Sequence, residues 1–256
     1  MHAQFAGLLP TQVVADLPRD EASAAALRAL VECHADELTA IIVEPLVQGA
    51  GGMLFHHGDV LRRLRALADE FDLLLIFDEI FTGFGRTGAM LACHAAGVAP
   101  DILTLSKALT GGTLPLAATI ASTKVFDAFW SDDPAHALMH GPTYMGNALA
   151  CAAANASLDL FETEPRLEQA AAIGARMREE LEPCRTRPGV RDVRVLGAIG
   201  VVELDSPAER TALTRAFLDQ GVWIRPFGNI VYLTPALTIS AEDLTALTRA
   251  IKRVLG

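Results

Sequence analysis

Three short, largely apolar segments separated by helical patterns constrain the fold of this 256-residue chain more than any other feature. They are TAIIV (39–43), LLLIF (73–77) and DILTLS (101–106). Strands of this kind that alternate with helices are typical of a parallel sheet covered on both faces, because such strands bury both of their sides. The sequence therefore predicts an α/β domain.

Apolar periodicity extends this alternation along the chain. Residues 59–71 illustrate it, since their apolar side chains fall on one face of a helix and their arginines on the other. The pattern predicts helices over 21–37, 59–71, 146–160, 165–182, 207–220 and 241–254, an apolar stretch over 114–121, and strands over 192–204, 222–228 and 229–236. Ser240 and Asp243 are expected to open the last helix as a capping box. We expect a large domain over 1–162 and a small α+β domain over 163–256.

Composition excludes several classes of function. The formal net charge is −10 and lysines and arginines do not cluster, which argues against a nucleic-acid partner. No apolar run approaches the roughly 20 residues of a membrane span. The four cysteines lie far apart, and the pair His56-His57 has no further ligand at helical spacing, so neither a disulfide framework nor a metal site is predicted. We expect a cytoplasmic protein.

A functional side chain follows each of the three apolar strands. Glu44 follows the first, Asp78 the second, and Lys107 the third. In open parallel sheets the ligand binds at the carboxyl ends of the strands. These three side chains are therefore predicted to line one crevice.

The glycines that follow Asp78 raise a dinucleotide-binding alternative. Gly83, Gly85 and Gly88 have the G-x-G-x-x-G spacing. In that motif, however, the first glycine directly follows a strand, and an acid ends the next strand to bind the ribose. Here residues 78–82 intervene and the next strand is followed by Lys107. The pattern therefore does not favour NAD.

Asp78 and Lys107 are the pair of side chains that pyridoxal 5′-phosphate (PLP) requires. An aspartate pairs with its protonated ring nitrogen, and a lysine forms a Schiff base with its aldehyde carbon. Apolar surroundings would favour the neutral, nucleophilic amine of Lys107. From the residues alone a second interpretation stays open, in which Asp78 caps the loop and Lys107 is a surface lysine.

Two segments around these residues resemble a known family. D-E-I-x-T-G-F-G-R-T-G (78–88) and S-K-A-L-T-G-G (106–112) are similar to segments of the class III, fold-type I, PLP-dependent aminotransferases. Residues 139–158, 194–203 and 221–233 resemble the branch that acts on a keto amino acid in biotin biosynthesis with S-adenosylmethionine as amino donor. The resemblance implies a PLP-transferase-like large domain with a mostly parallel sheet, and a homodimer with shared active sites.

The resemblance also implies cofactor contacts. Lys107 is implied to form the Schiff base, Asp78 to pair with the pyridine nitrogen, and Ile80 to pack against one face of the ring. Pro142 and Thr143, in the H-G-P-T segment, are implied to contact the cofactor, with Thr143 hydrogen-bonded to the phosphate bound by the neighbouring subunit.

On the substrate side, Arg225 is the implied clamp for a carboxylate, which a guanidinium binds in a bidentate manner. Tyr232 and Arg86 are further substrate-binding candidates, and Arg86 can also be interpreted as an arginine that stabilises its loop. Glu44 can be interpreted as part of the pocket wall. His140 is expected to order the H-G-P-T turn.

Members of the family are longer than this chain, and the missing length is expected to lie at the N-terminus. The absent part would carry a Gly-Ser phosphate-binding segment and the aromatic residue that stacks on the ring. We therefore expect weak PLP binding, or a fragment that needs a partner chain. The sequence leaves open whether the amino donor is S-adenosylmethionine or lysine.

Overall fold

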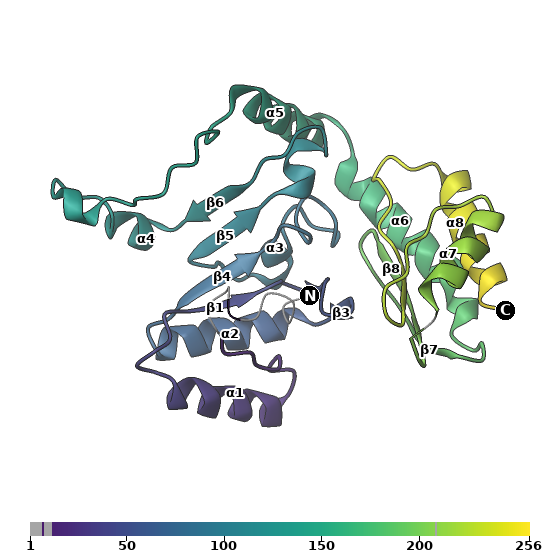
Figure 1. The fold of residues 1–256 in the computed structure, drawn as a ribbon, viewed down its shortest axis with the longest axis horizontal. Helices are drawn as coiled ribbons and strands as arrows, with labels where there is room; N and C mark the ends of the chain where they lie inside the picture. The colour runs from purple at the N-terminus through teal and green to yellow at the C-terminus, as the bar shows by residue number, and fades with distance from the viewer. Residues whose placement is uncertain (1–6, 8–11, 208) are drawn as a thin grey trace.

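The computed structural model of the chain describes residue 7 and residues 12–207 and 209–256. It contains two main sheets, of four and three strands, each with its own helices (Figure 1), and a two-stranded antiparallel pair, β2–β3. With η marking 3₁₀ helices, the elements up to the long connection are α1 (Glu21–Cys33), β1 (Ala40–Val43), β2 (Val47–Gln48), β3 (Leu54–Phe55), α2 (Gly58–Glu70), β4 (Leu74–Asp78), α3 (Ala92–Ala96), β5 (Ile102–Leu105), η2 (Lys107–Thr110), β6 (Ala118–Ala121), α4 (Thr123–Asp127) and η3 (Pro134–His136). Those that follow are α5 (Ala148–Thr163), α6 (Arg166–Leu181), η4 (Glu182–Cys184), β7 (Val190–Leu196), β8 (Ile199–Leu204), α7 (Arg210–Asp219), β9 (Ile230–Leu233) and α8 (Ala241–Val254).

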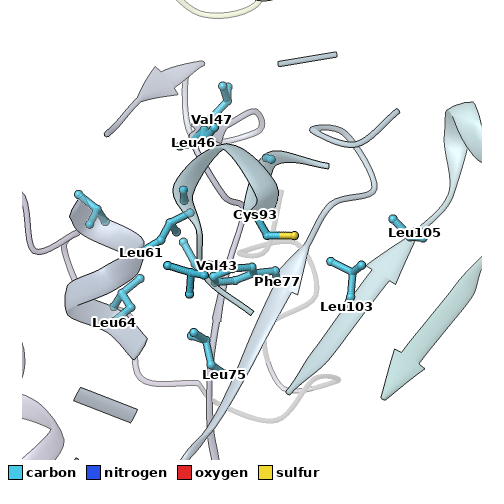
Figure 2. Close-up of a cluster of buried hydrophobic side chains, with 14 of the residues drawn as sticks. Val43, Leu46, Val47, Leu61, Leu64, Leu75, Phe77, Cys93, Leu103 and Leu105 are labelled. Atoms are coloured by element: carbon cyan, nitrogen blue, oxygen red, sulfur yellow. The ribbon is translucent and has the colours of Figure 1, made fainter. Parts of the chain in front are cut away.

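The larger sheet has the strand order β1-β4-β5-β6. β1, β4 and β5 are parallel, whereas β6 pairs with β5 in the antiparallel direction. The prediction of an α/β fold with a mostly parallel sheet is thus confirmed. The apolar face of α2 packs against this sheet, and Figure 2 shows Leu61 and Leu64 of the helix beside Leu75 and Phe77 of β4.

The second face of this sheet is covered less completely than predicted. Leu75 and Phe77 are fully buried, but Ile42, which is paired with Ile76 in the register, is 65% exposed. Successive residues of a strand point to opposite faces, so α2 covers Leu75 and leaves the face that carries Ile42. Ile120 of the edge strand β6 is also 52% exposed.

The smaller sheet has the order β7-β8-β9 and is antiparallel. α6 packs on it and on α8, and Met177, Leu181, Val202, Val231 and Ile251 form the centre of its core. Among the helices of the described residues, none has both the length and the apolar character needed to cross a membrane.

Two strand predictions in this part are wrong. Residues 192–204 form the hairpin β7–β8 and not one strand, because the chain turns at Gly197 with φ +51°. Residues 222–228 form no ladder, and Phe227 makes only an isolated bridge to Ile230. Pro226 within this segment has no N–H to donate to a neighbouring strand.

The helix predictions differ from the structure mainly at their ends. The helix expected over 21–37 ends at Cys33, where turns replace it. The last helix covers 241–254 as predicted, and the Ser240 Oγ accepts the Asp243 N–H at 3.0 Å. The return bond to the Asp243 carboxylate comes from the Ser240 hydroxyl, at 2.8 Å, and not from its backbone N–H as a capping box requires.

Between β6 and α5 the chain runs away from both sheets (Figure 1). Every residue from 126 to 146 is exposed. This segment, which we call the arm (126–146), is nevertheless rich in large apolar side chains. They are Phe126, Phe129, Trp130, Leu138, Met139, Tyr144 and Met145. Exposed apolar surface of this extent is typical of an interaction site.

Gly197 joins the two parts of the structure. The Ala198 N–H donates to the Arg86 carbonyl at 3.0 Å. A Cβ atom at Gly197 would lie 2.4 Å from the Thr87 carbonyl carbon and 2.5 Å from the Arg86 oxygen. Gly197 also lies close to the backbone of α6, because a Cβ atom added to Gly174 would be 2.5 Å from the Gly197 carbonyl oxygen. Only glycine fits at this position.

We predict that Gly197→Ala destabilises the chain by about 2–4 kcal/mol, from overpacking together with the left-handed backbone. Gly189→Ala is the matched control, since Gly189 has φ +81° but no atom within 4 Å of an added Cβ. Urea unfolding followed by circular dichroism measures both. Equal losses in the two variants would show that the close approach at Gly197 is unimportant.

Candidate active site

The carboxyl ends of β1, β4 and β5 meet at one edge of the larger sheet. Glu44 follows β1, Asp78 ends β4, and Lys107 lies two residues beyond β5. The three strands are parallel neighbours, and Asp78 pairs with Thr104 in the register. The structure therefore brings together the three side chains that the strand pattern predicted to share a crevice.

Asp78 retains one carboxylate oxygen that can accept a further hydrogen bond. Its Oδ1 accepts the Ile80 N–H at 3.1 Å and the Thr104 hydroxyl at 3.3 Å. Within the described part of the chain, its Oδ2 has no hydrogen bond or ion pair. The side chain is half-buried. A half-buried carboxylate of this kind suits a cationic N–H donor.

Lys107 begins η2 with an unusual backbone conformation. Its φ is +48°, a region that costs a residue other than glycine about 1–3 kcal/mol and that is enriched at functional sites. Its neighbours fix this turn. The Ser106 hydroxyl donates to the Leu116 carbonyl at 2.7 Å, and the Ser157 hydroxyl of α5 donates to the Ala108 carbonyl at 3.1 Å. The turn that carries the amine is thus held by α5 and by the segment that precedes β6.

The environment of the Lys107 amine differs from the expected one. Lys107 is exposed, so the apolar enclosure expected to favour the neutral amine does not form among the described residues. Its Nζ lies over the ring of Phe81, 5.2 Å from the centroid. The two predicted residues thus share one edge, but the amine there faces solvent and an aromatic ring.

Glu44 shares the electrostatic environment of this edge. Burial raises the pKa of its carboxyl, and the nearby Asp78 adds to the rise, while the Gly49 N–H and Lys107 oppose it. The carboxylates of Glu44 and Asp78 and the ammonium of Lys107 therefore lie close enough to interact. Glu44 thus contributes charge beside Lys107, although it does not line the pocket described below.

The raised pKa of Glu44 gives a testable pH dependence. The pKa of this carboxyl is higher in the folded chain than its ordinary value of 4.5, so the folded chain binds the proton more tightly than the unfolded chain does. The resulting contribution to stability is complete below pH 4.5. The contribution is lost as the pH rises through the folded pKa. We predict that Glu44→Gln gains stability relative to wild type as the pH rises from about 4.5 to about 7. Urea unfolding across this range is the measurement, and a difference independent of pH contradicts the assignment.

Glu79, which was not predicted as a site residue, has a structural role. It is fully buried, and its carboxylate accepts the Ala92 N–H at 2.6 Å and the Cys93 N–H at 2.8 Å at the start of α3. Burial raises the pKa of the Cys93 thiol to about 12, and the negative charge of Glu79 adds to this rise. The alternation of side chains along a strand could have indicated this role, because two adjacent carboxylates at a strand end point to opposite sides. Only one of the Asp78-Glu79 pair can therefore face the crevice.

Glu79→Ala is predicted to cost about 2–5 kcal/mol of stability, because two buried N–H groups lose their acceptor. Asp78→Ala is the control at the adjacent position, with an expected cost below about 1.5 kcal/mol since it loses only ordinary, partly solvated hydrogen bonds. Chemical unfolding of both variants measures the difference. A cost for Glu79→Ala no larger than the control's would show that the α3 N–H groups find water instead.

A pocket of about 660 Å³ opens beside Lys107. Ile80 and Phe81 line it from the loop after β4, α5 lines a second side, and the segment 234–238 after β9 lines a third. A volume of this size is typical of small-molecule and cofactor sites. Ile80, a predicted cofactor contact, thus lies in the pocket of Lys107.

Arg86 also lines this pocket, and hydrogen bonds hold its guanidinium there. Its Nη1 donates to the Ala198 carbonyl at 3.1 Å and to the Pro235 carbonyl at 2.8 Å. Burial lowers the pKa of its guanidinium. Carbonyls hold the group in place without neutralising it, so its charge remains available to an anion in the pocket.

Asp78 and Glu44 lie at the same sheet edge but do not line this pocket, and the other predicted residues are not brought into it either. Arg225 is exposed on the segment between α7 and β9, and Tyr232 in β9 packs edge-on against Phe227 with ring centroids 5.6 Å apart. Pro142 and Thr143 lie on the exposed arm (126–146). His56, half of the pair considered as metal ligands, is buried, with its Nε2 3.1 Å from the Glu44 carbonyl oxygen.

The fold and the edge that carries Asp78 and Lys107 define a class of protein, and comparison with known proteins agrees with it. The model of the aminotransferase class-III family matches residues 1–255. The chain belongs to this family, which confirms the resemblance seen in the sequence.

The relatives are more specific. The chain is 45% identical to the adenosylmethionine-8-amino-7-oxononanoate aminotransferase of Mycobacterium leprae, over 100% of this chain and 59% of that protein. It is 43% identical to the protein of the same name from Corynebacterium glutamicum, over 98% of this chain and 62% of that protein. The chain spans about three fifths of the length of these curated relatives.

Solved structures agree with this relationship. The adenosylmethionine-8-amino-7-oxononanoate aminotransferase of Methanocaldococcus jannaschii matches with a TM-score of 0.92 and 32% identity, over 99% of this chain and 62% of that one. A PLP-bound amine transaminase from an uncultivated Pseudomonas species matches with a TM-score of 0.83 and 36% identity, over 92% of this chain and 57% of that one. PLP-transferase-like architecture is therefore shared across the described part of the chain.

Proposed function

We propose that this chain acts in a PLP-dependent transamination that converts 8-amino-7-oxononanoate to 7,8-diaminononanoate in biotin biosynthesis, with S-adenosylmethionine as amino donor. The observation that carries the proposal is the meeting of Asp78 and Lys107 at one sheet edge, beside a pocket of about 660 Å³. The names of the relatives support the choice of substrates.

The residues at this edge fit PLP. The free Oδ2 of Asp78 is an acceptor suited to a protonated pyridine nitrogen, Lys107 supplies an amine, and Ile80 offers an apolar surface for the ring. When bound, the cofactor supplies an aldehyde that condenses with amines and a ring that withdraws electrons from the adjacent carbon.

The chain's own groups would then bind the substrate and move protons. Lys107 Nζ acts as the general base that takes the proton from the substrate Cα. Asp78 keeps the ring nitrogen protonated by holding its N–H with a carboxylate. Arg86, in the pocket, and Arg225 with Tyr232, outside it, are the groups proposed to bind the substrate carboxylate and its chain.

We further propose that the active unit is a homodimer with shared sites in the cytoplasm. The arm (126–146) supports a second copy as partner, because it exposes large apolar side chains and carries Pro142 and Thr143, which do not line the pocket of their own chain. The four cysteines are free, which suits a reducing compartment. Residues 1–162 are proposed as the large domain and 163–256 as the small one, because one hydrophobic core lies wholly within 163–256 and the other lies mostly within the first part of the chain.

A second candidate is a subunit that a separate polypeptide completes. Exposed Ile42 on the sheet and the exposed Lys107 favour it, since a covering segment would bury both. Turnover that appears only when such a polypeptide is added supports this candidate. Turnover by the chain alone excludes it.

We predict that Lys107→Ala lowers transaminase turnover by at least about 10²-fold, since the general base is lost. Borohydride treatment of the wild-type chain with PLP should attach the cofactor to Lys107, identified by peptide mass spectrometry against Lys124 and Lys252, the other two lysines of the sequence. Lys124→Ala is the matched control and should leave turnover unchanged. Labelling of all three lysines to equal extents contradicts the proposal.

A further inference from the structure

The ring of Phe81 is the group that the Lys107 amine contacts. The Nζ atom lies over its face, 5.2 Å from the centroid. Among the described residues, no hydrogen bond or ion pair is formed by this Nζ. A cation within about 6 Å of an aromatic centroid is attracted by the negative face of the ring. The resting place of the amine is therefore determined by the aromatic ring and not by a direct carboxylate partner.

Gly49 packs against the ring of Phe81. A Cβ atom at Gly49 would lie 3.1 Å from Phe81 Cδ1 and 3.5 Å from its Cε1, so the ring packs directly on the glycine backbone. The same Cβ would lie 3.3 Å from Glu44 Oε1. Gly49 is itself buried. The turn between β2 and β3 thus supports both the ring and the carboxylate near Lys107.

Phe81 therefore differs from the other aromatic residues of the pocket. Phe161 also lines the pocket, but it packs against Phe84 with centroids 6.2 Å apart and has no cation over its ring. Phe81 combines a fixed ring with a face turned to the one functional amine. Ile80, its neighbour, was the residue that the family resemblance placed at the cofactor.

We propose that Phe81 is a positioning residue for Lys107: its ring face holds the lysine ammonium beside the pocket whenever the amine is not bonded to the cofactor. This rests on the proposed function. The ring keeps the ammonium oriented and within reach of the carbon to which it must return. An aliphatic side chain of similar size fills the space but provides no negative face for the cation.

The chain offers a direct spectroscopic test because Lys107, Lys124 and Lys252 are its only lysines. Reductive ¹³C-methylation of the cofactor-free chain keeps the positive charge and gives one methyl signal for each lysine and one for the N-terminal amine, with Lys107→Arg assigning that of Lys107. Protons over the face of an aromatic ring are shielded. We expect the Lys107 methyl signal to lie upfield of those of the other two lysines, and this displacement to be lost in Phe81→Leu.

Two further variants make the test specific. Phe81→Tyr keeps the ring face and should retain the upfield position, whereas Phe161→Leu removes a pocket ring without a cation and should leave the signal unchanged. Gly49→Ala pushes on the ring and should reduce the displacement while Phe81 is present. If Phe81→Leu does not fold, the positions of the Lys107 methyl signal in Gly49→Ala and Phe81→Tyr still test the proposal. A Lys107 signal in the wild type that coincides with those of Lys124 and Lys252 overturns the proposal.

Turnover separates this proposal from the function on which it rests. Phe81→Leu should lower kcat with little change in KM for the amino donor, and Phe81→Tyr should restore it. An upfield Lys107 signal in a chain where Lys107→Ala leaves turnover intact supports the Phe81 contact and contradicts the proposed function. A normal signal together with turnover that depends on Lys107 contradicts the Phe81 contact alone.

Discussion

The parallel pairing of β1, β4 and β5 is the interaction on which the candidate site depends. Parallel strands end at the same edge, so the side chains that follow them meet there however far apart they lie in the sequence. The register that pairs Asp78 with Thr104 sets Asp78 near the turn at Lys107. Burial of Leu75 and Phe77 under α2 maintains this register, because a slip of one residue would turn both toward the other face.

The two adjacent carboxylates at the end of β4 have different roles, one at the candidate site and one in stabilising the fold. Asp78 is half-buried at the crevice with one free oxygen, whereas Glu79 is fully buried and binds the first N–H groups of α3. Ile80 and Phe81 follow in the turn after β4, and both line the pocket beside Lys107. Function at this edge thus depends on which side of the backbone each residue occupies.

Contacts with the smaller sheet complete the pocket. Arg86 is bonded to carbonyls of Ala198 and Pro235, and Gly197 lets the β7–β8 turn approach the loop that carries Arg86. The segment 234–238 lines the pocket as a result. The segment that follows β9 therefore forms one wall of the site, and hydrogen bonds to Ala198 and Pro235 hold the loop after β4 in place.

The sequence by itself determined the alternation of strands and helices, the side chains that follow β1, β4 and β5, and the family, because these depend on local periodicity and on short motifs. It misjudged residues 192–204 and 222–228, where Gly197 and Pro226 prevent a continuous ladder. Only the tertiary structure decided that Glu79 turns inward, that Lys107 is exposed, and that Phe81 lies under its amine. These are contacts between segments distant along the chain, so they are set by packing and register and leave no periodic signal in the sequence.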